Sequence, residues 1–301
     1  MFDSIGDTIE RLDATGYLID RDAATIAYLA ARMEKPLLVE GPAGVGKTEL
    51  ARAMSTALGR ELIRLQCYEG LDEAKALYEW EYAKQLLYTQ ILRDKIGETV
   101  GDAASLHEAV ERIATQDDVF FSERFLQPRP LLRAILSDNP VVLLIDEIDK
   151  ADAEFEAFLL EVLSDFAVTV PELGTMQAHT QPIVVLTSNA AREMSDALRR
   201  RCLHLHLDFP DEERERAIIR RRVPDASEAL ARQVASVVAR LRKLGLRKQP
   251  SIAESIDWAR ALLLLNAERL DPEVVSSTLS LVLKYEGDVR KGRENLAALL
   301  N

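Results

Sequence analysis

The chain has 301 residues, of which 48% are hydrophobic, and its formal net charge is −12. This length is enough for two domains with cores of their own, whereas the acidity disfavours nucleic-acid binding, which depends on neutralising phosphate charge. No apolar run approaches the roughly 20 residues that cross a bilayer, and the first residues lack the basic segment and apolar core of a secretory signal. Cys67 and Cys202 lie far apart and lack metal-ligand spacing, so we expect a cytoplasmic protein with two ordinary thiols.

Two helices are expected near the N-terminus, at residues 5–12 and from residue 20 or 22 to residue 32. Tyr17 lies in the short segment that separates them. A third helix and a strand at residues 61–65 are expected after the motif described next.

That motif matches a phosphate-binding loop. Residues 41–48 fill the pattern G-x-x-x-x-G-K-[ST] between an apolar run, residues 37–39, and a helical pattern that begins at Thr48. Such a loop lets successive backbone N–H groups surround phosphate oxygens at the start of a helix. Lys47 would reach the β and γ phosphates of a nucleotide, and Thr48 the magnesium ion. The expected nucleotide-binding residues are Gly41, Pro42, Ala43, Gly44, Val45, Gly46, Lys47, Thr48 and Glu49.

Residues 68–130 form the zone whose structure is hardest to predict. Helical patterns occur around residues 72–93 and 103–115. Much of the aromatic content lies here, at Tyr78, Trp80, Tyr82 and Tyr88. These side chains either cover a small core within this zone or meet protein partners.

An acidic pair then follows a strongly apolar run. Residues 141–145 are all aliphatic, which predicts a strand buried on both faces of a parallel sheet, and Asp146 and Glu147 come directly after it. Ligands bind at this edge of open α/β sheets. Asp146 can hold magnesium, and Glu147 is placed to polarise a water for attack on the γ phosphate. The alternative is a solvated acidic pair that only ends the strand.

A third strand is expected at residues 183–186, after an amphipathic helix at 155–163 and a hairpin at 168–175. Asn189 follows this strand. A polar side chain there could orient the attacking water between the two strand ends.

Arg199, Arg200 and Arg201 precede the alternating segment 203–207. Guanidinium groups stabilise charge on a transferring phosphoryl group and suit insertion from a neighbouring subunit, although at least one of the three is expected on a solvated face. His204 and His206 share one strand face, but two ligands without a third make only a weak metal site.

From about residue 211 the alternation of strand and helix stops, and four or five helices are expected. Ser251 and Glu254 form a plausible capping box, and Asp271 followed by Pro272 marks another helix start.

Besides an ATPase, two other functions remain open at this point: a P-loop phosphotransferase, and a nucleotide-gated binding module that hydrolyses ATP slowly or not at all.

The chain resembles an AAA+ ATPase of the MoxR family. The resemblance rests on the order of phosphate loop, acidic pair, Asn189 and terminal arginine, on the DEIDKA segment at 146–151, and on the LDFP segment at 207–210. It implies an α/β fold: an AAA+ P-loop core with a parallel sheet flanked by helices at residues 1–210, with an insert at about 68–130 and a hairpin at about 166–182. A small all-helical lid domain would occupy residues 211–301.

The same resemblance implies roles for individual residues. Thr48 and Asp146 would hold Mg²⁺, Glu147 would activate water, and Asn189 would sense the γ phosphate of ATP. Arg201 would be the finger that acts across a subunit boundary, with Arg199 and Arg200 as alternatives. The segment around Tyr17 would contact adenine, or else pack onto the core.

One position departs from the family pattern. A second sensor arginine is expected near the start of a lid helix, where this chain has Ala253. Arg247, Lys248 or Arg260 could supply the missing charge, so hydrolysis is expected to be slow or partner-dependent.

The resemblance finally implies partners. MoxR-type chains assemble into homo-oligomeric rings, here expected to be hexameric, that remodel or mature a client protein. Short acidic members are similar to ATPases that work with a von Willebrand factor A domain partner in activating metalloenzymes, including metal or sulfur insertion into carbon monoxide dehydrogenase. A metalloenzyme client is therefore expected.

Overall fold

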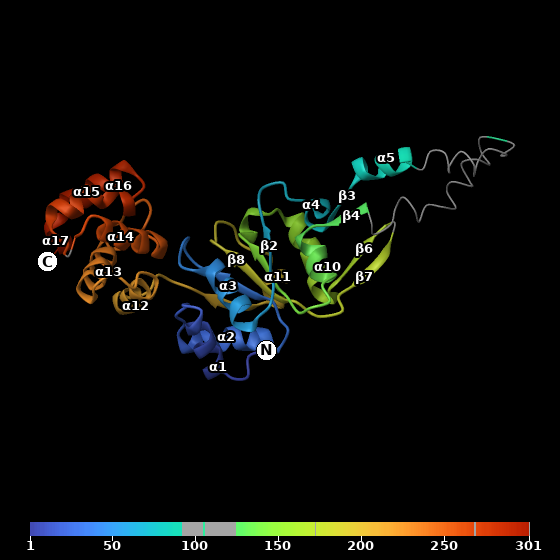
Figure 1. The fold of residues 1–301 in the computed structure, drawn as a ribbon, viewed down its shortest axis with the longest axis horizontal. Coiled ribbons are helices and arrows are strands. Elements are labelled where there is room, and N and C mark those ends of the chain that lie inside the picture. The colour runs from blue at the N-terminus through green and yellow to red at the C-terminus, as the bar shows by residue number, and fades with distance from the viewer. Residues whose placement is uncertain (92–104, 106–124, 172, 268, 301) are drawn as a thin grey trace.

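The computed structural model describes residues 1–91, 105, 125–171, 173–267 and 269–300. Its centre is a five-stranded parallel sheet in the order β2-β5-β8-β1-β9 (Figure 1). The strands are β1 Leu37–Glu40, β2 Leu62–Gln66, β5 Val142–Asp146, β8 Ile183–Ser188 and β9 Leu203–His206.

The central strands are buried on both faces, as their unbroken aliphatic runs predict. All residues of β5 and β8 are buried. Along β5, Leu143 and Ile145 join one hydrophobic cluster and Val142 and Leu144 join another, since successive side chains point to opposite faces.

Helices cover both faces of the sheet. One cluster includes side chains from α1 Ile5–Ala14, α2 Arg21–Arg32 and α3 Lys47–Leu58. The other includes side chains from α4 Glu73–Leu77, α9 Pro130–Ile135, α10 Ala153–Asp165 and α11 Asp196–Arg201. The expected α/β fold, with a parallel sheet flanked by helices, is therefore confirmed.

The helix expected over residues 72–93 is wrong in part. The chain forms α4, then strand β3 Tyr78–Trp80, then α5 Tyr82–Ile91. Strand β3 pairs antiparallel with β4 Leu126–Pro128, a partner distant in sequence that local periodicity cannot reveal. The pattern at residues 103–115 lies outside the described residues, apart from Ser105.

The aromatic residues of this zone do not share one environment. Trp80 is buried in the cluster beneath the main sheet rather than in a separate small core. Tyr82 is 67% exposed and Tyr88 is 42% exposed. The expectation of a self-contained aromatic core therefore fails for Trp80.

The hairpin expected before the third strand is present. Strands β6 Ala167–Val170 and β7 Gly174–Gln177 pair antiparallel, and the buried side chains of Val168 and Val170 fix the hairpin to the sheet cluster. A 3₁₀ turn, η2 Ile148–Lys150, follows β5 directly.

The C-terminal part is helical, as Figure 1 shows. Its buried side chains form a hydrophobic cluster of their own. Both predicted helix starts are present: Ser251 and Glu254 form the capping box of α14, and Asp271 caps α15 with Pro272 in the first turn. The boundary expected near residue 210 falls between β9 and α12 and stays a prediction. The described helices here are α12 Glu212–Arg222, α13 Glu228–Arg242, α14 Ile252–Leu264, α15 Pro272–Val282, α16 Glu286–Glu294 and α17 Leu296–Leu300.

Cys67 and Cys202 are both free and buried. Burial raises the pKa of each thiol to about 12. Because the thiolate is the reactive form, both cysteines are expected to be inert at neutral pH. Within the described ranges, no helix has the length and apolarity needed to cross a bilayer.

Candidate active site

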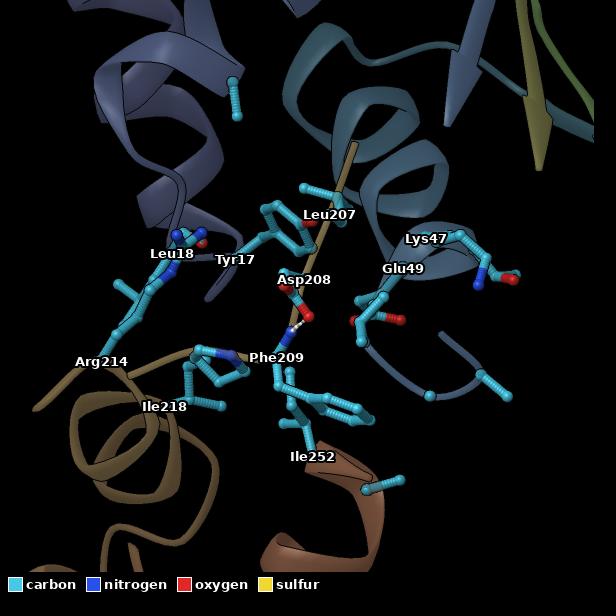
Figure 2. A pocket seen from close by; sticks show the side chains of 18 of the residues that line it. Tyr17, Leu18, Lys47, Glu49, Leu207, Asp208, Phe209, Arg214, Ile218 and Ile252 are labelled. Carbon is cyan, nitrogen blue, oxygen red and sulfur yellow. Dashed lines mark hydrogen bonds between the residues drawn. The ribbon is translucent and has the colours of Figure 1, made fainter. Parts of the chain in front are cut away.

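A cavity of about 970 Å³ opens where the carboxyl edge of the sheet, the N-terminal linker and the C-terminal helices meet. Figure 2 shows Tyr17 and Leu207 beside the phosphate-loop helix, with Phe209 and Ile252 on the side of the C-terminal helices. Its volume lies at the upper end of the range for small-molecule and cofactor sites, about 300–1,000 Å³. The sequence-predicted site residues on its wall are Tyr17, Ala43, Gly44, Val45, Gly46, Lys47, Thr48, Glu49, Asp146, Glu147 and Asn189.

The loop at residues 41–48 needs glycine at two crowded positions. Gly41 has φ +149°, and a Cβ there would lie 1.9 Å from the carbonyl oxygen of Leu207. Gly44 has φ +77°, and a Cβ there would lie 2.3 Å from Cβ of Ser251. The loop thus follows a path that only glycine allows, between β9 and the C-terminal helices.

Lys47 lies inside the loop. Its ammonium group donates to the carbonyl oxygens of Gly41 and Pro42, both at 2.7 Å, and to Oδ1 of Asn189 at 2.9 Å. Burial lowers the pKa of Lys47, and nearby carboxylates, first that of Asp149, oppose this effect. A phosphate group would replace these neutral acceptors with charged ones, which make stronger hydrogen bonds. The residues present therefore fit a bound phosphate.

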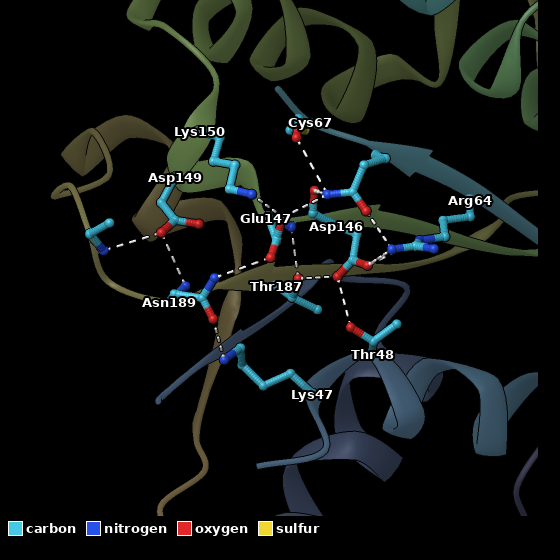
Figure 3. A network of polar contacts seen from close by, with 12 residues as sticks. Lys47, Thr48, Arg64, Cys67, Asp146, Glu147, Asp149, Lys150, Thr187 and Asn189 are labelled. Carbon is cyan, nitrogen blue, oxygen red and sulfur yellow. Dashed lines mark hydrogen bonds and ion pairs between the residues drawn. The ribbon is translucent and has the colours of Figure 1, made fainter. Parts of the chain in front are cut away.

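Asp146 is the centre of a second group of contacts (Figure 3). Its Oδ1 accepts hydrogen bonds from Oγ1 of Thr48 at 2.9 Å and from Oγ1 of Thr187 at 2.5 Å. Its Oδ2 accepts from Nε and Nη2 of Arg64, at 3.0 and 2.6 Å. The two residues expected to hold magnesium, Thr48 and Asp146, are thus in contact, and their oxygens suit a hard divalent cation.

Glu147 begins the turn after β5 with φ +58°, an uncommon value for a residue other than glycine. Its backbone N–H donates to Oγ1 of Thr187 at 2.9 Å. Its Oε2 accepts from Nε2 of Gln66 at 2.8 Å and from Nζ of Lys150 at 2.6 Å. The hydrogen bond with Glu147 raises the pKa of Lys150. The carboxylate is therefore held in one orientation at the edge of the sheet.

Asn189 connects the ammonium group of Lys47 to the carboxylate of Glu147. Its Oδ1 accepts a hydrogen bond from Lys47, and its Nδ2 donates to Oε1 of Glu147 at 3.4 Å, so hydrogen bonds link the three side chains in series in Figure 3. The N–H groups of Asn189 and Ala191 both donate to Oδ2 of Asp149, at 3.2 and 3.1 Å. Asp149 thereby fixes the turn that presents Asn189.

Sequence reasoning missed the partners that hold these groups. Arg64 and Gln66 lie two residues apart on β2, and both reach the acidic pair across the β2-β5 register. Lys150 belongs to the DEIDKA segment, but its contact with Glu147 was not predicted. The strand expected at 61–65 could end at the same edge as the acidic pair, but nothing in the sequence marks Arg64 and Gln66 as partners of that pair.

Tyr17 and Glu49 both line the cavity. Tyr17 is buried, which raises the pKa of its hydroxyl. Its Cε2 would lie 3.6 Å from a Cβ at Gly46, so the ring packs beside the phosphate loop. Glu49 forms an ion pair with Arg222 of α12, which links the phosphate-loop helix to the C-terminal helices.

Arg201 lies apart from this cavity. Its side chain is exposed, and it makes no ion pair or hydrogen bond within the described part of the chain. The structure therefore does not bring Arg201 together with Glu147 in a single chain.

The lid position that lacks an arginine, Ala253, does lie on the cavity wall. Of the candidates for the missing charge, Arg260 also lines the cavity. Arg247 instead lies over the ring of Tyr285, with its guanidinium carbon 4.1 Å from the ring centroid, and Lys248 lies 3.4 Å from Glu254. Position thus favours Arg260.

Among the described residues, no group of three or more His, Cys, Asp or Glu side chains could hold a metal ion by itself. His204 and His206 therefore gain no third ligand from the described residues. A magnesium ion at Thr48 and Asp146 would need further oxygens from phosphate or water, as is usual for this ion.

The family is shown by comparison with known proteins. The model of the AAA domain, dynein-related subfamily, matches residues 36–202, which is more than half of the 301 residues. The chain belongs to this family of AAA+ proteins. The MoxR-type resemblance inferred from the motifs agrees with the relatives given next.

Two curated relatives are MoxR-family AAA+ ATPases. Protein NorQ of Paracoccus denitrificans is 25% identical over 210 residues, which cover 70% of this chain and 66% of NorQ. Gas vesicle ATPase GvpN2 of Halobacterium salinarum is 25% identical over 281 residues, which cover 88% of this chain and 72% of GvpN2. The chain thus spans slightly less than two thirds of NorQ. Family membership and these relatives support ATPase activity.

Among solved structures, a point mutant of Thermotoga maritima RuvB aligns with a TM-score of 0.50 and 18% identity. The alignment covers 92% of this chain and 72% of RuvB. At this identity the likeness concerns the fold alone, and it agrees with the AAA+ P-loop architecture.

Replacing Gly44 by alanine is expected to push the segment at Ser251 away from the phosphate loop. The new Cβ would lie 2.3 Å from Cβ of Ser251, and the N–H of Ile252 donates to the Gly44 carbonyl at 3.2 Å. We expect faster amide hydrogen exchange at Ile252 and a loss of about 1–3 kcal/mol in unfolding free energy. Gly70→Ala is the control, because Gly70 also has positive φ, +80°, but nothing lies within 4 Å of its missing Cβ. Equal exchange at Ile252 in both variants would contradict the contact.

Proposed function

We propose that this protein is a magnesium-dependent ATPase that works as a ring and remodels or matures a client protein. The observation that carries the proposal is the connected set of Lys47, Asn189 and Glu147, beside the Thr48–Asp146 contact. A phosphate-binding amine, a polar sensor and a carboxylate base at one sheet edge are what phosphoryl transfer to water requires.

Each residue has a task in this proposal. The backbone of the loop and Lys47 bind the phosphates of ATP. Tyr17 and Leu18 line the part of the cavity where the adenine of ATP would lie. Thr48 and Asp146 would hold Mg²⁺, which when bound would neutralise phosphate charge and polarise the phosphate oxygens. Glu147 accepts the proton of the attacking water, and Asn189 holds the side chains of Glu147 and Lys47 in place relative to each other through its hydrogen bonds with both.

The finger residue requires a second subunit. Because Arg201 is exposed and does not line the cavity of its own chain, we propose that it reaches the nucleotide of a neighbouring chain. This supports a ring, proposed to be hexameric, in which each site is completed by the adjacent protomer.

The client is proposed from the resemblance to MoxR-type chains. We propose a metalloenzyme client, with a von Willebrand factor A domain protein as a partner, in the cytoplasm. Metal or sulfur insertion, as in carbon monoxide dehydrogenase maturation, is the specific form of this proposal.

A second candidate function is a nucleotide-gated binding module with little hydrolysis. It is favoured by the contacts of Glu147, since both its oxygens are already engaged by Gln66, Lys150 and Asn189. A rate of phosphate release by the wild type, with ATP and Mg²⁺, far above that of Glu147→Gln would exclude it.

The test begins with Lys47→Ala. We expect affinity for a fluorescent ATP analogue to fall by about 100-fold, because a charged hydrogen bond to phosphate contributes about 1.5–3 kcal/mol and the loop carbonyls lose their partner. Lys35→Ala is the control, since Lys35 is an exposed lysine with no contact to the cavity. Specific activity of the wild type should also rise with protein concentration. Equal affinity in both variants would overturn the nucleotide site.

A further inference from the structure

The arginines at 199, 200 and 201 have different surroundings. Successive residues of a helix are rotated by about 100°, so the three side chains point in different directions. Arg199 reaches the end of β1: its Nη1 and Nη2 lie 3.2 Å from Oε1 and Oε2 of Glu40. Arg200 and Arg201 are exposed and make no ion pair with any described residue. Arg199 is therefore already engaged in its own chain.

Further contacts hold this pair in place. Nε2 of His204 donates to the carbonyl oxygen of Arg199 at 2.9 Å, and Nδ1 of His204 lies 3.8 Å from Oε2 of Glu40. The carbonyl of Glu40 accepts from the N–H of Leu207 at 2.8 Å. The buried side chain of Leu198 anchors the same helix on the sheet cluster. Helix α11 is thus held against the last residue of β1 and against His204 of β9.

Glu40 lies next to the phosphate loop in the sequence. It is the last residue of β1 and directly precedes Gly41, where the phosphate loop begins. The Glu40–Arg199 pair therefore ties the helix that bears Arg201 to the start of the phosphate loop of the same chain. A two-point contact between carboxylate and guanidinium restrains orientation as well as distance.

We propose that Arg199 is a positioning residue rather than the finger: through Glu40 it orients α11 so that Arg201 reaches the nucleotide of the neighbouring subunit. This inference rests on the proposed function. A displacement of about 1 Å in a catalytic group can lower a rate by about 100-fold. Loss of the pair should thus reduce kcat at the adjacent site and leave the KM for ATP nearly unchanged, because nucleotide binding does not use this contact.

A mixed-subunit assay tests this directly. One subunit carries Arg201→Ala, which removes the finger but keeps Glu147. The other carries Glu147→Gln, which removes the base but keeps the finger. Each alone should be inactive, whereas co-expression should create composite sites that hydrolyse ATP.

Arg199→Ala is then added to the Glu147→Gln subunit. We expect composite kcat to fall about tenfold or more with KM unchanged. Glu40→Gln in that same subunit should give a similar loss, and both changes together should give no further loss, because they remove one interaction. Arg199→Lys should restore part of the rate, since it keeps the charge but loses the two-point geometry.

The outcomes separate this inference from the proposed function. If Arg199→Ala leaves the composite activity unchanged, the inference is overturned while the ring mechanism stays intact. A loss with Arg199→Ala but none with Glu40→Gln assigns the finger role to Arg199 and also overturns it. If composite activity falls only when Arg199→Ala is placed in the Arg201→Ala subunit, the inference is also overturned, because Arg199 would then act on the nucleotide site of its own subunit. No composite activity at all overturns the proposed arrangement in trans.

Discussion

Glu147→Gln is expected to lower kcat for ATP hydrolysis by about 10²–10⁴-fold, the usual contribution of a positioned general base. Glutamine keeps the size of the side chain and one oxygen that can accept a hydrogen bond from Gln66 or Asn189, but it cannot accept a proton from water. Affinity for ATP should change less than about threefold, because Lys47 and the loop are untouched. Phosphate release under saturating ATP measures the first effect, and titration with a fluorescent analogue measures the second.

Glu161→Gln is the matched control for this change. Glu161 is an exposed carboxylate on α10, and no described residue pairs with it. Its neutralisation should leave both kcat and affinity as in the wild type. If Glu147→Gln behaved like Glu161→Gln, Glu147 would not be the base, and the carboxylate of Asp149 would be the next to examine, since its Oδ1 is buried without a hydrogen-bond partner among the described residues.

The local part of the site could be predicted from the sequence, because its chemistry is contiguous. The loop at 41–48 carries its glycines, lysine and threonine within eight residues, and the positive φ of Gly41 and Gly46 accounts for the two fixed glycines of the pattern. The strand before Asp146 could be predicted for the same reason: an aliphatic run suits a strand buried on both faces.

Contacts between distant segments could not be predicted. Arg64 meets Asp146 across 82 positions, and Arg199 meets Glu40 across 159. Nothing near Arg64 in sequence distinguishes it from an exposed residue of an edge strand. Strand β3 was missed likewise, because its partner at 126–128 lies far along the chain. Periodicity reports which face of an element is buried, but not which element lies opposite.

The C-terminal helices depend on one buried ion pair. Glu215 of α12 is fully buried, and its carboxylate pairs with Arg242 of α13, whose side chain is 8% exposed. Oε1 of Glu215 also accepts from Oγ of Ser255 at 2.6 Å. The guanidinium carbon of Arg242 lies 4.5 Å from the ring centroid of Phe209, and its Nε donates to the Pro250 carbonyl at 2.9 Å. One side chain therefore joins two helices to the segment before α14.

Arg242→Ala is expected to lower the unfolding free energy of this helical part by about 3–5 kcal/mol, because it leaves the buried Glu215 carboxylate without a counter-ion. Urea unfolding monitored by Trp258 fluorescence measures the loss, since Trp258 is fully buried in this cluster, and Trp80→Phe removes the other tryptophan. Arg232→Ala on the same helix is the control: its side chain is 64% exposed, and its pair with Glu228 should contribute less than about 0.5 kcal/mol. Equal losses would mean that the pair at 215 and 242 is no more important than a surface contact. Because Pro250 directly precedes Ser251, which contacts Gly44, Arg242→Ala should also weaken ATP binding, whereas Arg232→Ala should not.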